Sequence, residues 1–560
     1  MAKSNIHFEV LGQKGGGWSL QRVCDDEKAA TENARFFLKE QKLTAAKVMK
    51  ITYDTKGQSY QEKEVYFEGT RAVAGTKADV DLILPVCRNA TELYRSDSRR
   101  EIFNALRKPL LGWNIMPIEL LYGAEHVQRL NDAGQILQGA VQKVAISQIQ
   151  KTGQKVNERV LELYSYTNEI LKDLKHRRQK SDLGLDPSQD LVELYEKLKE
   201  SDDRKKDFFI ALSHLYSKSK TLEEKFEKTL SYIEQYDDDH ILNYLDQYLA
   251  DHLNLGDNVK ALIGEEDTLG GGLLSLIDLI RGQLKPRADR HKSIDRLCAL
   301  YRENKMPASR KSLVHKLVTS LEGNASFDSN DLLKNMLFHR QIADRMHLGG
   351  EKYVGGLEAY DAIKGRCERL TGTSTIGRLL EEQEHPLDRV ERLLQASGGF
   401  VGAVNLRALA NYIIPILESG HNRQLVIKEI GEGLNTLRRL SALQRLARKS
   451  GFPDFFLKRI LEDLDDLAFE GIKKTGILDN MVAQSSDMLV AGTALLGIIF
   501  RGEMPRPKSM QEFKNFSRRT IMAEKFLLNI QQTSKQSPNG RSKLQQFYKL
   551  LEDTRMDLSA

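Results

Sequence analysis

Cysteine is scarce in this sequence. Four cysteines occur among 560 residues, at Cys24, Cys87, Cys298 and Cys367, and they lie far apart along the chain. A disulfide-stabilised domain needs many cysteines in a short chain, and a zinc site needs closely spaced pairs. The four cysteines fit neither arrangement, and this usage predicts a reducing compartment.

Long apolar runs are also missing. The longest strongly apolar stretch is the 13 residues from Met488 to Phe500, bounded by Asp487 and Arg501. A membrane-spanning helix needs about 20 apolar residues, so we expect a buried central helix here, with a re-entrant or interfacial segment as the alternative. The amino terminus has no apolar core of the length that a secretory signal requires. We therefore expect a cytoplasmic protein with no stable membrane insertion.

The chain has no large excess of charge of either sign. Lys and Arg number 84 and Asp and Glu 78, so the formal net charge is only +6. This excludes both an acidic solvating tail and a histone-like polycation. With 40% hydrophobic and 29% charged residues, the composition is that of a globular protein long enough for three or four average domains.

Sequence signatures of catalysis are mostly absent. There is no GxxxxGK[ST] phosphate loop, no GxSxG nucleophile elbow, and no cysteine with a histidine at a recognisable spacing. The closest glycine-rich candidates are Gly431-Glu432-Gly433, which lacks a third glycine, and Gly270-Gly271-Gly272, which lacks a lysine. Both predict helix junctions. We therefore assign no catalytic residue and no cofactor, although an enzyme whose site is assembled from dispersed residues stays an alternative.

Metal-ligand patterns are equally weak. His339, Asp344 and His347 form the most suggestive trio, but a step of eight residues turns the two imidazoles about 80° apart on a helix, unlike the step of four in HExxH. The acidic stretch from Asp237 to His252 begins with three adjacent aspartates, which point in different directions on a helix and complement its dipole. We predict structural roles for both groups and no metal site.

Residues 1–75 show period-two alternation of apolar residues, which is typical of half-buried strands. Two predicted hairpins flank a helical stretch from Asp26 to Gln41. The alternating positions are Phe8 and Val10, Trp18 and Leu20, Met49, Ile51 and Tyr53, and Val65 and Phe67. This order predicts a small α+β (ββαββ) domain. The edges of such a sheet can accept an additional strand from a partner.

The rest of the chain is predicted to be predominantly α-helical, as a large multi-helix bundle or an irregular helical array. No repeat with a fixed period of 30 to 50 residues is evident. Helix-start signals occur at Asp186-Pro187, Thr221 with Glu224, and Ser509 with Glu512. From glycine-rich and polar stretches we expect a linker at 76–90, helical domains at 91–263 and 273–530, a second linker at 531–543 and a terminal helix at 544–560.

Two segments keep heptad spacing. The first comprises Val156, Val160, Leu163, Thr167, Ile170 and Leu174, and the second comprises Phe513, Phe516, Thr520, Ala523, Leu527 and Ile530. Steps of three and four residues predict either antiparallel helix pairs within one bundle or a dimerising coiled coil. The second interpretation would make the protein a homo-oligomer.

One predicted helix carries a basic stripe with no acidic residue inside it. The stripe consists of Arg438, Arg439, Arg445, Arg448 and Lys449, on a helix whose leucines would face a core. Such a stripe can contact nucleic-acid phosphates or an anionic surface, or it can be a solvated helix end. No aromatic residues are interleaved with the basic ones, which weakens the nucleic-acid interpretation.

These observations favour a non-catalytic function. The leading hypothesis is a cytoplasmic scaffold or signalling adaptor that acts by protein–protein interaction. A nucleic-acid-associated regulator that uses the basic helix near 438–449 is the second hypothesis, and an enzyme with dispersed site residues is the third.

Overall fold

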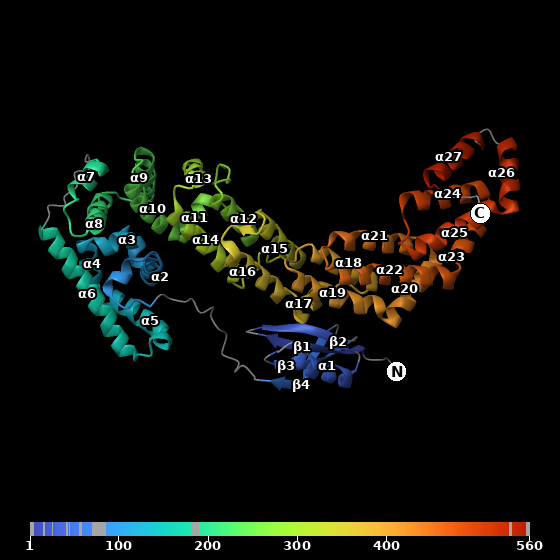
Figure 1. The fold of residues 1–560 in the computed structure, drawn as a ribbon, viewed down its shortest axis with the longest axis horizontal. Helices are drawn as coiled ribbons and strands as arrows, with labels where there is room; N and C mark the ends of the chain where they lie inside the picture. The colour runs from blue at the N-terminus through green and yellow to red at the C-terminus, as the bar shows by residue number, and fades with distance from the viewer. Residues whose placement is uncertain are drawn as a thin grey trace. The chain divides into compact units, whose positions relative to one another are not determined.

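The computed structural model describes residues 5–14, 17–24, 26–40, 43, 45–54, 59–69, 86–180, 190–485, 487–536 and 540–555 (Figure 1). The protein is 74% helical, with 27 α-helices in these ranges and a small four-stranded sheet at the amino terminus. The predicted fold class is therefore confirmed. A two-stranded hairpin, β5 (His347–Gly349) and β6 (Lys352–Tyr353), is too short to have been recognised from periodicity.

The amino-terminal domain has the predicted ββαββ order. Its elements are β1 (Asn5–Lys14), β2 (Gly17–Cys24), α1 (Glu27–Glu40), β3 (Ala45–Asp54) and β4 (Ser59–Gly69). All strand pairs are antiparallel, and the order across the sheet is β2-β1-β3-β4. The second hairpin therefore lies beside the first through the β1–β3 pair, and β2 and β4 form the two edges.

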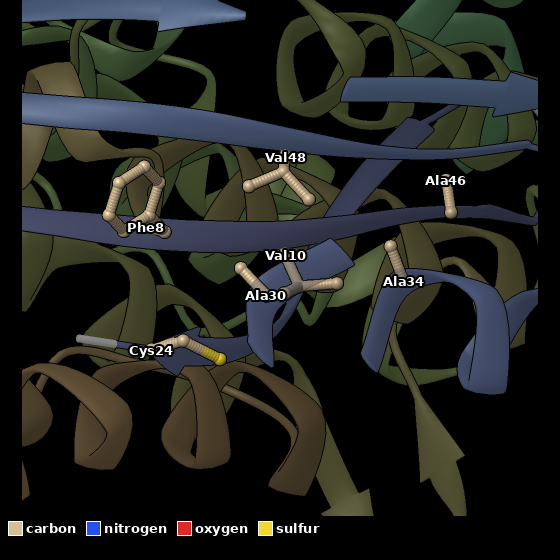
Figure 2. Packing of buried hydrophobic residues seen from close by; sticks show 7 residues of the cluster. All are labelled: Phe8, Val10, Cys24, Ala30, Ala34, Ala46 and Val48. Atoms are coloured by element: carbon tan, nitrogen blue, oxygen red, sulfur yellow. The ribbon is translucent and has the colours of Figure 1, made fainter. Parts of the chain in front are cut away.

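The core of this domain lies between α1 and one face of the sheet (Figure 2). Its buried residues are Phe8, Val10, Cys24, Ala30, Ala34, Ala46 and Val48. Alternate residues of a strand share a face, so Phe8 and Val10 both point toward the helix. Ala30 and Ala34 are four residues apart on α1, and their small side chains allow the helix to approach the sheet closely.

The chain forms two compact units. The first unit comprises residues 1–74, 328–341 and 363–560, and the second comprises 75–327 and 342–362. The division falls within α15 (Leu332–Met346) and α16 (Gly356–Leu370), not at the break that we expected near 264–272. There, Gly270 lies in the first turn of α12 (Leu269–Ile280), and its N–H donates to the carbonyl of Phe327 at 3.0 Å. Of the expected linker at 76–90, residues 76–85 lie outside the described ranges.

The remaining helices complete the two units. Those of the second unit are η1 (Ala90–Tyr94), α2 (Ser96–Trp113), α3 (Pro117–Tyr122), α4 (Ala124–Asp132), α5 (Gly134–Thr152), α6 (Val156–Lys180), α7 (Leu191–Lys197), α8 (Arg204–Ser217), α9 (Leu222–Gln235), α10 (Asp239–Asn254), α11 (Gly256–Ile263), α13 (Ile294–Arg302) and α14 (Pro307–Glu322). Those of the first unit are α17 (Thr373–Leu380), α18 (Pro386–Ser397), α19 (Ala403–Glu418), α20 (Gly420–Glu432), α21 (Asn435–Lys449), α22 (Asp454–Thr475), α23 (Ile477–Ala483), α24 (Met488–Arg501), α25 (Lys508–Met522), α26 (Glu524–Gln536) and α27 (Gly540–Asp553).

Buried aspartates on two long helices cap the first turns of other helices. On α10, Asp246 accepts from the N–H of Ala308 at 2.6 Å and of Ser309 at 3.0 Å, at the start of α14. Asp465 on α22 does the same for α25, accepting from Lys508 at 2.6 Å and Ser509 at 2.9 Å. The first N–H groups of a helix have no intrahelical partner, and the helix dipole favours a negative charge there. Each carboxylate therefore fixes one helix end against another helix.

A third buried aspartate acts on α3. Asp251, also on α10, accepts from the N–H of Ile118 at 2.9 Å and from Nε of Arg99 at 3.0 Å. Both Arg99 and Asp251 are almost completely buried. Two aspartates of α10 thus hold the starts of two different helices, α3 and α14, in the second unit.

The three helices capped in this way follow the same turn. In each, a residue with positive φ follows the preceding helix within two positions, and this residue is Asn114, Asn304 or Gly502. The next residue donates its N–H five positions back, as in a Schellman motif, and a buried methionine followed by a proline comes next. The three pairs are Met116-Pro117, Met306-Pro307 and Met504-Pro505. The turn recurs at intervals far longer than those in which we looked for a repeat.

Helix starts and ends differ from the prediction at several places. Thr221 is the predicted N-cap of α9, and its hydroxyl accepts from the N–H of Glu224. Ser509 is not an N-cap, because α25 begins at Lys508 and Asp465 supplies the cap instead. Asp186-Pro187 lies outside the described residues. The expected linker 531–543 is largely helical, since α26 extends to Gln536 and α27 begins at Gly540.

The first heptad segment forms α6. Leu163, Ile170 and Leu174 are buried in the second unit, where α6 packs against α4, α5 and η1. A loop of three residues joins α5 to α6, so the two helices form a hairpin within one bundle. The apolar heptad positions of α6 are thus covered by neighbouring helices of the same chain.

The second heptad segment is not one helix. α25 ends at Met522 and α26 starts at Glu524, so Ala523 lies in the break. Phe516 and Thr520 are not among the buried residues of α25, which are Ser509, Met510, Phe513, Ser517 and Ile521, and Leu527 is 47% exposed. The heptad prediction is wrong here, because the buried stripe follows the helical period of each short helix.

The apolar run at 488–500 forms α24. Leu489 and Leu496 of this helix pack in a cluster with Ile521, Phe526 and Phe547, which come from α25, α26 and α27. The expected central helix is therefore buried by the carboxyl-terminal helices. Within the described ranges, no helix combines the length and the apolarity needed to cross a bilayer.

The capping carboxylate of α25 predicts a stability difference between two neighbouring aspartates. Asp465→Ala leaves two N–H groups at a buried helix start without their acceptor and is expected to lower the free energy of unfolding by about 2–3 kcal/mol. Asp466→Ala removes only the exposed ion pair with Lys508, which is worth about 0.5 kcal/mol or less. Urea denaturation followed by circular dichroism compares the two variants. An equal loss in both would contradict the capping role.

Candidate functional site

The basic stripe lies on α21. The predicted core face of this helix is confirmed, since Leu437, Leu440 and Leu443 are buried. Arg438, Arg445, Arg448 and Lys449 are exposed and Arg439 is partly buried, which agrees with their position on the opposite side of the helix.

The structure pairs the amino-terminal half of the stripe with acids from other helices. Arg438 Nε lies 2.7 Å from Glu503, and Arg439 forms ion pairs with Asp388 and Glu391 of α18. These acids are distant in the sequence, so the absence of acidic residues inside the stripe gave no indication of them. The positive charge available to a ligand is therefore reduced at Arg438 and Arg439.

The carboxyl-terminal half of the stripe is less engaged. Arg445 donates to the hydroxyl of Ser441 at 3.2 Å and to the carbonyl of Gly502 at 3.3 Å. Arg448 and Lys449 form no ion pair with the residues that the structure describes. Cations at the last turn of a helix are favoured by its dipole, which is sufficient to explain their position.

The histidines and acids that we considered as metal ligands make hydrogen bonds within the fold. His339 is buried, and its Nδ1 hydrogen-bonds the carbonyl of Asn335 at 2.8 Å; burial lowers its pKa to about 4. His347 lies in β5, exposed, with Nε2 against the carbonyl of Gly350. Asp238 caps α10 by accepting from the N–H of His240 and Ile241. Across the described ranges, no three His, Cys, Asp or Glu side chains converge as a metal site would require.

A cluster of buried charges in the second unit was not expected from the sequence. Lys225 Nζ lies 2.7 Å from Glu119, and Arg99 lies 3.0 Å from Asp251, with all four side chains at most 3% exposed. Burial raises the pKa of Glu119 and of Asp251, whereas the neighbouring cations lower it. The four groups come from α2, α3, α9 and α10. Their mutual pairing gives them a structural role in joining these helices.

The second unit contains an apolar cavity and an open cleft, and neither is lined by that cluster. One is an apolar cavity of about 120 Å³ among α2 to α6, with Leu106, Leu130 and Val141 in its lining. The other is a cleft of about 1080 Å³ lined by α2, α11, α12 and α14. The buried charges thus face neither hollow, which leaves the dispersed-residue enzyme hypothesis without support from them.

The outer edge of β4 is a second candidate interaction surface. β4 pairs only with β3, and no other described strand lies on its far side. Lys63, Glu64 and Glu68 are exposed along it. Unpaired backbone N–H and C=O groups at such an edge can hydrogen-bond an added strand. Charged side chains on an edge strand also discourage indiscriminate pairing, so any added strand must suit their charge.

Comparison with known proteins gives no relative. No protein-family model, no curated protein and no solved structure matches the chain. The functional argument therefore rests on the sites themselves.

Proposed function

We propose that the protein is a non-catalytic scaffold or signalling adaptor in the cytoplasm that acts by protein–protein interaction. The observation that carries the proposal is the outer edge of β4, which no described strand pairs. An edge of this kind binds an extended peptide by main-chain hydrogen bonds, while the alternating side chains provide specificity.

The charges on β4 indicate the kind of peptide. Between Gln61 and Glu68 the strand contains three glutamates and one lysine. Like charges directly opposite each other in a sheet are destabilising, and opposite charges contribute favourably. The proposed partner segment is therefore extended and basic. The helical units would then hold this domain and further partners together.

A nucleic-acid contact through the basic stripe is the alternative function. Its support is confined to Arg445, Arg448 and Lys449, because Arg438 and Arg439 are paired with acids. Contacts of this kind would be independent of sequence and sensitive to salt, since they neutralise phosphates.

The edge-strand proposal predicts that charge reversal on β4 weakens partner capture. Glu64→Lys should reduce the amount of protein captured by the tagged full-length chain severalfold, because a basic peptide is then repelled. The control is Glu32→Lys, which makes the same charge change at an exposed position on α1. Quantitative capture after nuclease treatment, at low and high salt, compares both with the unchanged protein. Equal capture by the two variants would exclude β4 as the docking element.

The nucleic-acid alternative makes a separate prediction. Arg448→Glu with Lys449→Glu should weaken binding to single- or double-stranded oligonucleotides and lower the slope of log affinity against log salt by about 2. Lys428→Glu with Lys458→Glu is the control, since it makes the same charge change at exposed positions on α20 and α22. Filter binding over a range of salt concentrations gives both slopes. If the two double variants bind alike, the stripe makes no phosphate contact.

A further inference from the structure

The cleft of about 1080 Å³ in the second unit has a basic wall that neither proposed function uses. α2 contributes Arg100 to its lining, and α14 contributes His315 and Lys316. Lys260 of α11 lines the same cleft. These residues lie on three helices and come together only in the folded protein, so their spacing along the chain did not predict the wall.

Lys316 and His315 are partly shielded from water, and each lies near an arginine of α2. Burial lowers the pKa of Lys316 to about 8, and the positive charge of Arg107 on α2 adds to this effect. Burial also lowers the pKa of His315, as does the charge of Arg100. Keeping like charges close together, partly out of water, raises the free energy of the protein without a ligand. A ligand of opposite charge that binds between them lowers this free energy.

The acids near the wall leave this repulsion in place. Asp257 forms an ion pair with Arg107 at 3.0 Å. It changes the pKa of Lys316 less than Arg107 does. Glu358 changes the pKa of His315 less than Arg100 does. Glu101 approaches Arg100 to 3.8 Å, and the buried Nε of Arg100 donates to none of the acceptors in the described residues.

Other acids in the lining have partners of their own. Glu266 lies 3.1 Å from Arg290, and Asp289 lies 2.5 Å from Arg287. Glu265 and Asp267, which flank Glu266 in the lining, are exposed. The positive charge of the wall therefore comes from Arg100 and Lys316, because the lowered pKa of His315 favours its neutral form at pH 7.

The floor of the cleft is apolar. Val259 of α11 and Leu273 and Leu276 of α12 line it, each at most 6% exposed. A ligand that fits both surfaces carries a compact anionic group at one end and an apolar body at the other. A phosphate monoester carries close to two negative charges at neutral pH and three acceptor oxygens, so it can meet more than one cation at once.

We propose that this cleft binds a small amphipathic phosphate monoester, whose phosphate contacts Arg100, His315 and Lys316 while its apolar part lies on Val259, Leu273 and Leu276. The guanidinium and ammonium groups donate to the phosphate oxygens. The apolar contact adds affinity in proportion to the area removed from water. The inference is independent of the adaptor proposal, because β4 and the cleft belong to different units.

Isothermal titration calorimetry of the full-length protein with octyl phosphate tests the proposal. Saturable binding is expected at pH 7, with at least tenfold weaker binding of inorganic phosphate, octanoate and octanol. Octanoate binding as tightly as octyl phosphate would overturn the assignment to phosphate. Equal binding of inorganic phosphate would overturn the role of the apolar floor, and equal binding of octanol would overturn the role of the cations.

Variants locate the site. Lys316→Gln and, separately, Arg100→Gln should each weaken octyl phosphate binding at least tenfold, while Lys311→Gln, exposed on the same helix, should leave it unchanged. Circular dichroism verifies that each variant is folded. Retained affinity in both Lys316→Gln and Arg100→Gln would overturn the proposal, as would the absence of saturable binding to the unchanged protein.

Proton uptake provides a readout that a purely structural role of Lys316 would not give. Around pH 8 the free Lys316 is partly deprotonated, and a bound phosphate favours its charged form, so binding should take up a proton. Arg107 and Asp257 act on the pKa of Lys316 from outside the lining of the cleft. Titrations in buffers of different ionisation enthalpy measure the uptake, and Lys316→Gln should abolish it. Binding to the unchanged protein without uptake at pH 8 would contradict the contact with Lys316.

Discussion

Buried carboxylates at helix starts are the interaction on which both helical units depend. Asp246 and Asp251 of α10 hold α14 and α3, and Asp465 of α22 holds α25. Burial of a carboxylate is costly, and it raises the pKa of Asp246 and Asp251. The N–H groups of the capped helices and the guanidinium of Arg99 offset that cost. Because each carboxylate belongs to a different helix from the one it caps, it fixes the packing of two helices and not only the end of one.

Ion pairing also determines which charged surfaces are available to bind a ligand. Arg438 and Arg439 are held by Glu503, Asp388 and Glu391, so half of the basic stripe is part of the helical packing. In the cleft of the second unit, by contrast, Arg100 and Lys316 lie next to an apolar floor, beside His315, whose pKa burial lowers. The edge of β4 offers unpaired backbone groups and acidic side chains. A basic peptide and a small anion are thus suited to two separate places on one chain.

Local patterns predicted the elements, and distant contacts decided the sites. Period-two alternation identified the ββαββ domain, and leucine spacing identified the buried face of α21. The acid partners of Arg438 and Arg439 are distant along the chain, so no spacing rule could find them. The second heptad prediction was wrong because the spacing of three and four residues continues across the break between α25 and α26 at Ala523. The recurrent Met-Pro pair, in contrast, was visible in the sequence. Its role became clear only in the structure, where each pair lies at or just before the start of a helix that a buried aspartate caps.

Hydrogen exchange in the full-length protein tests the central claim about the carboxylates most directly. The first-turn amides of α20, at His421 and Asn422, have no side-chain cap and should exchange rapidly, as is usual for helix starts. The amides of Ala308, Ser309, Lys508 and Ser509 should instead be protected as strongly as helix interiors, because Asp246 and Asp465 accept from them. Rapid exchange of these four amides, at the rate of those in α20, would contradict the account.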